Sequence, residues 1–490
     1  MLPVIIQGGM GAGISSWVLA AAVASRGHLG VVSGTAMDTI LVRRLNDGDP
    51  GGHYRRALAA YPMQEYVEEV LKRFFRPEGR EGAPYTPLKM FSMKLDLERA
   101  RLLVLGSFAD VFLAREGHDG LVGVNLLTKI QFPNLPSLYG AMLAGVNCVL
   151  MGAGIPRDIP GSLDRMAQHE PSSMHIDVLG ANGSDDEILR FDPRDIWDRD
   201  PIEVTRPAFL PIVASNSLAT MMARKASGSI EGFIVEGPTA GGHNAPPRGP
   251  RQFNERGEPL YGERDVVDLQ KLGELGLPFW VAGGAGNPGR LEEVRAQGAV
   301  GIQVGTLFAF SDESGLRADL KARTIQAALA GKVDVYTDDR ASPTGFPFKV
   351  VTLDGTLSDA GVYEKRERVC DLGYLRTPYR REDGKIRFRC ASEPVDTFLK
   401  KGGSLEETVG RKCLCNGLMA NIGAGQVRDN EAGEELPILT SGDDLVILDR
   451  FLRGRTHYTA ADVLDYLLGV PAGAASGSAH SLAEVPISVL

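Results

Sequence analysis

The chain has 490 residues and lacks an uninterrupted apolar run of the roughly 18 residues that a membrane-spanning helix needs. Its longest candidate, Trp17–Ala24, is short and follows a glycine-rich turn. The first residues enter a strand pattern without the basic and apolar segments of a secretory signal peptide. We therefore expect a cytoplasmic protein that has no membrane segment.

An excess of basic residues is also missing. The chain has 53 Lys and Arg against 62 Asp and Glu, a net charge of −9. Nucleic-acid-binding domains normally carry a basic surplus, so we expect a small-molecule substrate and no nucleic acid. Apolar residues make up 43% and charged residues 23%, which excludes a disordered or fibrous chain. Association into a homo-oligomer is left open.

Cysteine is scarce, with five residues in all. Cys148 lies in an apolar run and is predicted to be a small core residue. The other four are Cys370, Cys390, Cys413 and Cys415. Four thiolates would suit zinc or an iron–sulfur cluster, but a C-x-C pair is not the usual zinc knuckle. The sequence leaves two interpretations open for them, a metal centre or packing residues.

Short apolar runs alternate with helical patterns over the first 330 residues. The predicted strands are Val4–Gln7, Leu29–Ser33, Leu121–Leu126, Cys148–Met151, Phe209–Ala214, Gly232–Glu236, Phe279–Ala282 and Gly301–Val304. The predicted helices between them are Trp17–Arg26, Ser217–Lys225, Val266–Leu275, Leu291–Gln297 and Leu316–Ala330. This alternation favours a parallel sheet, and eight strands suggest an α/β fold closed as a (β/α)₈ TIM barrel. A ninth run, Ser173–Leu179, is assigned to an inserted hairpin or loop.

The remaining sequence suggests three regions. Residues 1–335 would form the barrel, with insertions at about 40–110, 170–207 and 244–263. Residues 336–432 would form a cysteine-containing module, where the alternation stops. Residues 433–490 would form a short helical segment, with two short helices in 440–469 and a frayed tail from Pro471.

Glycine is abundant, at 59 of 490 residues. Its clusters follow the predicted strands directly, at residues 8–11, 33–35, 237–242, 283–284 and 305–306. Glycine at a strand end lets the backbone approach a ligand that a Cβ would exclude. In a barrel that end is the active face, so five such turns predict a phosphate-bearing cofactor. A Rossmann fold is disfavoured because its Gly-x-Gly-x-x-Gly fingerprint is missing.

His243 is the histidine best placed for chemistry. It ends the sequence from Val235 to Gly242, which leaves a buried strand through a glycine turn. An imidazole there can take up or give a proton near neutral pH. The alternative interpretation is a solvated loop histidine.

Several of these motifs together resemble the nitronate monooxygenase family, formerly called 2-nitropropane dioxygenases. They are Ile6–Gly11, Asn125 within 122–127, Ala240–His243, Ala282–Gly284 and Ile302–Thr306, and the resemblance covers about residues 1–330. It implies an FMN-binding TIM barrel that oxidises a nitronate or similar acidic-carbon substrate with O₂, with His243 as acid/base. The residues it implies for FMN binding are Gly9, Met10, Gly11, Asn125, Lys129, Glu236, Gly241, Gly242, Gly283, Gly284, Gly305 and Thr306.

The chain departs from the family in ways that leave its substrate open. Relatives usually carry Gln where this chain has Glu236, and Glu where it has Thr239. A carboxylate beside a flavin would disfavour the anionic reduced form through like-charge repulsion. Two alternatives therefore remain. One is an NAD(P)H-dependent FMN enoyl reductase of fatty-acid or polyketide type, which shares the Ala-Gly-Gly-His turn. The other is a catalytically inactive barrel that acts as a binding or assembly component.

Overall fold

Eight parallel strands close into a barrel in the computed structural model, which describes residues 2–428 and 433–470. The strand order is β1-β10-β9-β8-β7-β4-β3-β2, and a parallel bridge between Ile6 and Leu29 joins the two ends. The strands are β1 (Ile5–Gln7), β2 (Gly30–Ser33), β3 (Val122–Leu127), β4 (Cys148–Gly152), β7 (Ala208–Val213), β8 (Phe233–Glu236), β9 (Phe279–Ala282) and β10 (Gly301–Val304). The predicted (β/α)₈ barrel and its eight strands are confirmed.

The barrel interior is filled by apolar side chains. One buried cluster inside the barrel includes Val31, Cys148, Leu210 and Trp280. The Trp280 indole donates a hydrogen bond to the Pro3 carbonyl at 2.7 Å, which satisfies its one polar group. Cys148 therefore packs as a small apolar residue, as predicted. Its burial raises the pKa of the thiol.

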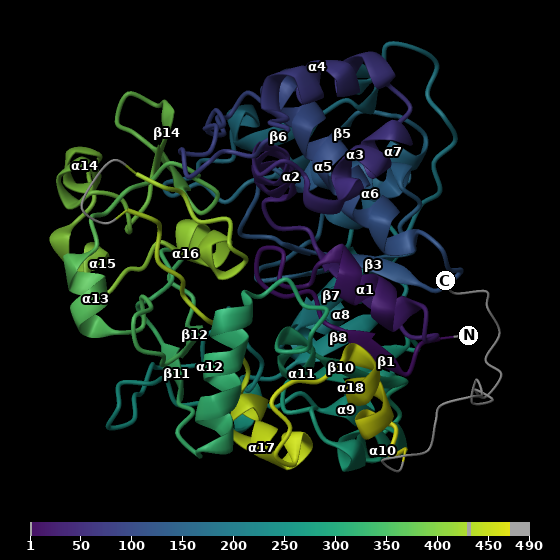
Figure 1. The fold of residues 1–490 in the computed structure, drawn as a ribbon, viewed down its shortest axis with the longest axis vertical. Helices are drawn as coiled ribbons and strands as arrows, with labels where there is room; N and C mark the ends of the chain where they lie inside the picture. Colours follow the sequence, from purple (N-terminus) through teal and green to yellow (C-terminus); the bar gives the residue numbers. More distant parts are fainter. Residues whose placement is uncertain (1, 429–432, 471–490) are drawn as a thin grey trace.

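Helices surround the barrel (Figure 1). Polar caps begin several of them: the Ser16, Ser215 and Asn287 side chains each accept a hydrogen bond from a first-turn backbone N–H. The barrel helices are α1 (Trp17–Ala24), α6 (Asn134–Leu143), α7 (Ile159–Ala167), α8 (Asn216–Lys225), α9 (Leu269–Gly273), α10 (Pro288–Ala296), α11 (Thr306–Ala309) and α12 (Ala318–Leu329). Helix α9 is shorter than predicted because Asp268 caps it, accepting from the Lys271 N–H.

Two insertions have the predicted character. Between β2 and β3 lie α2 (Met37–Asn46), α3 (His53–Ala59), α4 (Gln64–Phe74) and the long α5 (Leu97–Arg115). Helix α5 packs on α1, α2, α3 and α6. The run near Ser173 forms β5 (Ser172–His175), which pairs antiparallel with β6 (Ile188–Phe191). The prediction of an inserted hairpin is confirmed.

The C-terminal part adds two hairpins and several short helices beside the barrel (Figure 1). The hairpins are β11 (Val335–Asp338) with β12 (Phe348–Val351), and β13 (Thr377–Arg380) with β14 (Ile386–Arg389). The helices are α13 (Ala360–Lys365), α14 (Val395–Lys400), α15 (Leu405–Thr408) and α16 (Leu414–Asn421). The chain then returns to the barrel, where α17 (Leu448–Leu452) packs on α12 and α18 (Ala460–Leu467) packs on α1 and α10.

The two short helices predicted within 440–469 are confirmed by α17 and α18. The tail from Pro471 lies outside the described residues. The division into three regions stays a prediction. No helix within the described ranges combines the length and apolar character that a membrane crossing requires.

Candidate active site

One pocket lies where the strands of the barrel end. Its walls contain nearly every residue that the resemblance implied: Gly9, Met10, Gly11, Asn125, Glu236, Gly241, Gly242, His243, Gly283, Gly284, Gly305 and Thr306. Lys129 is the exception. Its amine lies 2.9 Å from the Asp177 carboxylate and 5.1 Å from the centre of the Phe346 ring, outside the pocket lining.

Hydrogen bonds of buried side chains shape the first turn of the pocket. The Gln7 amide donates to Ser15 Oγ at 2.8 Å and accepts from the Val31 N–H at 3.0 Å. Ser15 Oγ in turn accepts from the Met10 N–H at 2.9 Å. A Cβ added to Gly9 would lie 2.2 Å from the Asn125 Cβ, so only glycine allows this close approach. The turn is thereby held against β3.

The turns after β8 and β9 add glycines in left-handed backbone conformations to the pocket wall. The φ angles are +79° at Gly242, +84° at Gly283 and +63° at Gly284, a region that side chains disfavour. A Cβ on Gly283 would lie 2.9 Å from Thr239 Oγ1, whereas one on Gly242 would meet no atom within 4 Å. The pocket is thus bounded here by bare backbone.

Two polar atoms of the lining have no partner within the described part of the chain. Gln303 Oε1 and Thr35 Oγ1 are both buried, and no hydrogen bond reaches either. Buried polar atoms are nearly always satisfied in folded proteins. A polar ligand in the pocket would satisfy this pair.

His243 is held by residues of the C-terminal part. Its Nε2 lies 2.7 Å from Ser342 Oγ, which also hydrogen-bonds with Thr344 Oγ1 at 2.8 Å. The imidazole meets the Phe348 ring edge-on, with ring centres 4.9 Å apart. Burial lowers its pKa to about 4, so the ring is neutral at pH 7. The imidazole is therefore held in a fixed orientation in the pocket wall and is not a solvated loop side chain.

Glu236 ends β8 between the main pocket and a smaller one that Arg248, Tyr261 and Asp265 help to line. Burial raises the pKa of its carboxyl group to about 7. A carboxyl group with this pKa is about half protonated at pH 7, and its protonated form can donate a hydrogen bond, as the Gln of relatives would. The charge conflict that the sequence suggested is therefore reduced.

The sequence did not reveal a strap that completes the pocket, residues 440–444. Thr440 Oγ1 accepts from the Gly242 N–H at 2.9 Å, and the Gly442 N–H donates to Thr306 Oγ1 at 3.0 Å. The Asp444 carboxylate accepts from the Gly286 N–H at 2.9 Å. The only local signal for this role was a small polar run, Thr-Ser-Gly, after an apolar stretch. Phe348, Leu375 and Leu418 also line the pocket and were not predicted.

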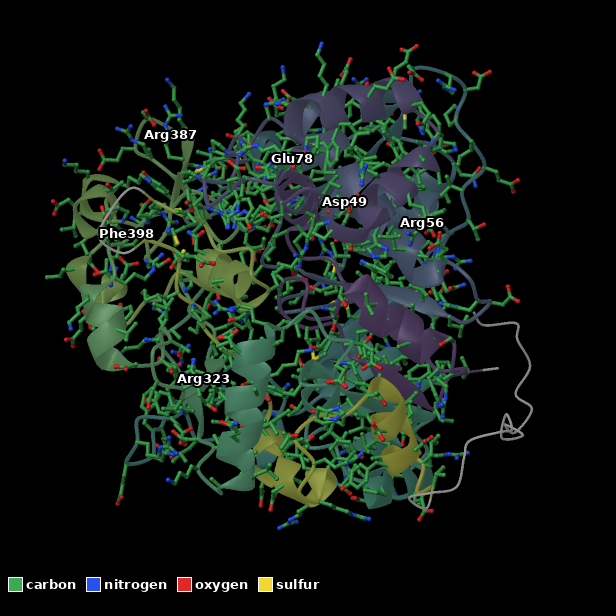
Figure 2. The ribbon with its side chains drawn as sticks, in the orientation of Figure 1. Asp49, Arg56, Glu78, Arg323, Arg387 and Phe398 are labelled. Atoms are coloured by element: carbon green, nitrogen blue, oxygen red, sulfur yellow. The ribbon has the colours of Figure 1, made fainter. Side chains whose placement is uncertain are left out.

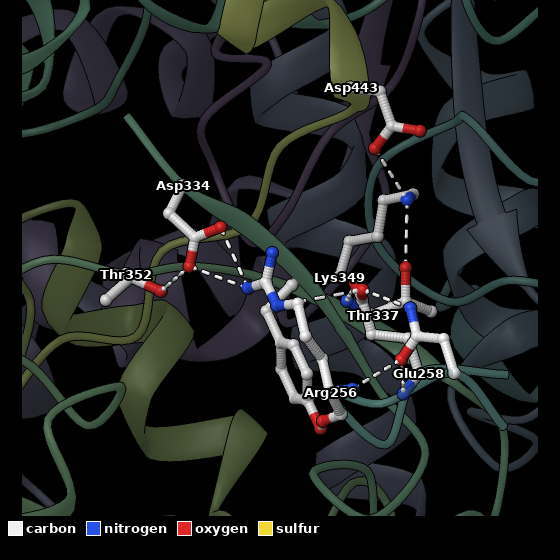
Figure 3. A network of polar contacts seen from close by, with 9 residues as sticks. Arg256, Glu258, Asp334, Thr337, Lys349, Thr352 and Asp443 are labelled. Carbon is white, nitrogen blue, oxygen red and sulfur yellow. Dashed lines mark hydrogen bonds and ion pairs between the residues drawn. The ribbon is translucent and has the colours of Figure 1, made fainter. Parts of the chain in front are cut away.

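A polar network anchors the strap to its neighbours (Figure 3). The buried Lys349 amine donates to Asp443 Oδ1 at 2.7 Å and to Thr337 Oγ1 at 2.9 Å. The Thr337 N–H donates to Glu258, which lies in the insertion 244–263. These hydrogen bonds link the strap, the β11–β12 hairpin and the insertion 244–263 to one another beside the pocket.

The four C-terminal cysteines lie in one neighbourhood but do not form the predicted metal centre. A hydrogen bond with Cys390, burial and the charges of Cys413 and Cys415 raise the pKa of the Cys370 thiol. Cys390 Sγ also lies 3.1 Å from Ser392 Oγ. Within residues 2–428 and 433–470, no group of three or more His, Cys, Asp or Glu side chains is arranged to hold a metal ion. The zinc or iron–sulfur prediction is therefore unsupported.

A parallel eight-stranded barrel with its pocket at the carboxyl ends of the strands is the arrangement of TIM-barrel enzymes. Residues 203–337 match the family model described as nitronate monooxygenase. The resemblance seen in the sequence is confirmed over this part of the chain, and it indicates an oxidoreductase.

Solved structures of similar fold share little sequence with the chain. They include a FabK variant from Thermotoga maritima, at 15% identity, covering 95% of this chain and 92% of that chain, with a TM-score of 0.45. Nitroalkane oxidase from Streptomyces ansochromogenes has 15% identity, 95% coverage of each chain and a TM-score of 0.42. The enoyl reductase domain of MlnA from Bacillus amyloliquefaciens has 12% identity, 96% and 94% coverage and a TM-score of 0.41. No curated protein matches the chain.

Proposed function

We propose that the chain is an FMN-dependent oxidoreductase that uses O₂ to oxidise a nitronate, or the parent nitroalkane after a side chain has taken the proton from its acidic carbon. The proposal rests on one observation. Five glycine turns and a neutral, oriented His243 line the same pocket. The match of residues 203–337 supports the same class of reaction.

The residues present fit a flavin phosphate and ring. The left-handed turns at Gly283 and Gly284 leave bare backbone on one wall, and Thr306 adds a hydroxyl beside them. Backbone N–H groups in such turns suit a phosphate. Gln303 Oε1 and Thr35 Oγ1 offer unsatisfied polar atoms to the rest of the cofactor. When bound, FMN would supply the electron transfer that no side chain of this pocket can perform.

The side chains would then handle the proton. Because burial keeps the imidazole neutral, His243 is ready to accept a proton from substrate. Ser342 holds Nε2, which leaves Nδ1 for that proton. Glu236, protonated below about pH 7, can donate a hydrogen bond into the pocket.

Anaerobic stopped-flow absorbance of the purified holoprotein tests the proposal. A nitronate should bleach the flavin bands, O₂ should restore them, and NADPH should reduce the flavin far more slowly. Fast reduction by NADPH alone would favour the enoyl reductase. Colourless protein that takes up no FMN would favour the inactive binding component.

A further inference from the structure

A further cavity is lined mainly by basic side chains of the C-terminal part. Its lining shares no residue with the active-site pocket. It has a volume of about 880 Å³. Its charged lining residues are Arg376, Arg380, Arg381, Arg387, Arg389, Lys400, Lys401 and Glu382. The lining thus contains seven cationic side chains and one anionic side chain, although the net charge of the whole chain is −9.

Acidic neighbours neutralise only part of this charge. Arg380 pairs with Asp186 and Glu187 of the inserted hairpin region, and Lys401 pairs with Glu393 at 2.7 Å. The other five cations take part in no ion pair within the described residues. Arg376 and Arg389 donate hydrogen bonds to backbone carbonyls instead. Arg381, Arg387 and Lys400 are exposed, and an anion in the cavity would offset this concentration of like charge.

The cavity wall is ordered by packing and backbone hydrogen bonds. The Leu179 N–H donates to the Pro378 carbonyl, and the Arg380 N–H donates to the Leu179 carbonyl, both at 2.9 Å. The Arg389 guanidinium lies 4.9 Å from the Tyr379 ring centre and 5.2 Å from that of Phe398. Arg389 is only 9% exposed. Figure 2 shows Arg387 on β14 and Phe398 on α14 at this end of the molecule.

The cavity also adjoins the active site through the backbone. Leu375 lines the active-site pocket, and the next residue, Arg376, lines the basic cavity. Consecutive Cα atoms are about 3.8 Å apart, so one short segment separates the two spaces.

We propose that this cavity binds a small anion that carries a diphosphate group. Guanidinium groups present paired N–H donors that match phosphate oxygens, and arginine prevails in this lining. The Tyr379 and Phe388 rings in the same lining provide apolar faces beside the charge, which suit a nucleoside. The ligand is therefore free pyrophosphate or a nucleoside diphosphate.

Isothermal titration calorimetry of the full, flavin-loaded chain with inorganic pyrophosphate, ADP and adenosine tests this proposal. Pyrophosphate or ADP should bind, adenosine should not, and added NaCl should weaken binding through screening. Tighter binding of ADP than of pyrophosphate would identify the nucleotide as the ligand class, and the reverse would identify free diphosphate.

The decisive variant is Arg381→Gln/Arg387→Gln/Lys400→Gln, which removes three exposed, unpaired cations of the cavity. Each charge-assisted hydrogen bond contributes about 1.5–3 kcal/mol, so affinity should fall at least about tenfold. The control, Arg224→Gln/Lys225→Gln/Arg295→Gln, removes three exposed cations elsewhere and should bind like the wild type. Equal binding by the cavity variant, equal losses in both variants, or no heat from either phosphate compound would overturn the proposal.

Discussion

At the scale of single residues, the pocket depends on groups whose ionisation burial has changed. His243 is neutral near pH 7 and Glu236 is largely protonated below it, both because desolvation disfavours the charged forms. The pocket lining therefore contains a neutral imidazole and a carboxyl group that carries little charge below pH 7.

His243→Ala should retain FMN and lose turnover. General acid–base catalysis typically contributes about 10²- to 10⁴-fold, so kcat should fall within that range. Steady-state assays with a nitroalkane, whose acidic carbon must lose a proton, measure turnover, and the flavin absorbance of the purified protein measures FMN retention. His457→Ala is the control, because that side chain is 79% exposed and, among the described residues, its one ion pair is with Asp312. Wild-type turnover in the His243 variant would rule out its catalytic role.

Glu236→Gln should change how stability depends on pH. The folded-state pKa of Glu236 is about 7 against 4.5 for a free carboxyl group. The folded form therefore binds the proton more tightly, and stability falls as pH rises from about 4.5 to 7, levelling off above that. The Gln variant should lack this decline and should have a higher Tm than wild type at pH 8.

Thermal unfolding between pH 4.5 and 8.5 checks this expectation. Glu274→Gln, which alters an exposed carboxylate near α9, should follow the wild-type profile. If the Tm of wild type and of the Glu236 variant changed in parallel with pH, the Glu236 carboxyl group would be ionised over this whole pH range, which contradicts the prediction.

Residues of the site differ in how far sequence could predict them. His243 and the glycines stand in short motifs directly after strands, so local pattern and chemistry locate them. Ser342 lies 99 positions from its partner His243, and only tertiary packing brings the two together. For the four C-terminal cysteines the sequence left a metal centre and packing residues open, and no metal-holding group is found among the described residues.

At the scale of elements, the barrel strands were predictable because each is a buried apolar run of three to six residues followed by a turn. The strap at 440–444 was not, because its hydrogen bonds join it to turns more than 130 positions earlier. The C-terminal hairpins lack the apolar periodicity that would have identified them. Regular alternation thus reveals the scaffold, whereas the parts that close the pocket depend on long-range contacts.

Gly284→Val should abolish flavin retention. Valine disfavours the φ of +63° found there, and its Cβ would lie 3.3 Å from Thr239 Oγ1, which displaces the wall of the phosphate cradle. The ratio of flavin to protein absorbance after gel filtration measures the effect. Gly276→Val is the matched control, since Gly276 has φ +73° and no atom within 4 Å of its added Cβ, away from the pocket. Full flavin content in the Gly284 variant would show that the cradle lies elsewhere.

At the scale of the whole molecule, the pocket joins segments from both ends of the described chain. The turn at 8–11 comes from the first strand, and the strap at 440–444 follows the cysteine-containing region. Helices α17 and α18 then pack back on the barrel. A ligand in this pocket would therefore contact both parts of the chain, and we expect its binding to stabilise them together.

FMN should raise the Tm of flavin-depleted protein in a concentration-dependent manner. A ligand that binds only the folded state stabilises it by about 2.7 kcal/mol at 100 times its Kd. Riboflavin has the same ring without the phosphate, so it should raise Tm less if the turns at 283–284 and 305–306 hold that phosphate. Differential scanning calorimetry across a range of each compound compares them. Equal shifts by FMN and riboflavin would exclude the phosphate cradle, and the absence of any shift would exclude a flavin site, because binding to the folded state must raise Tm.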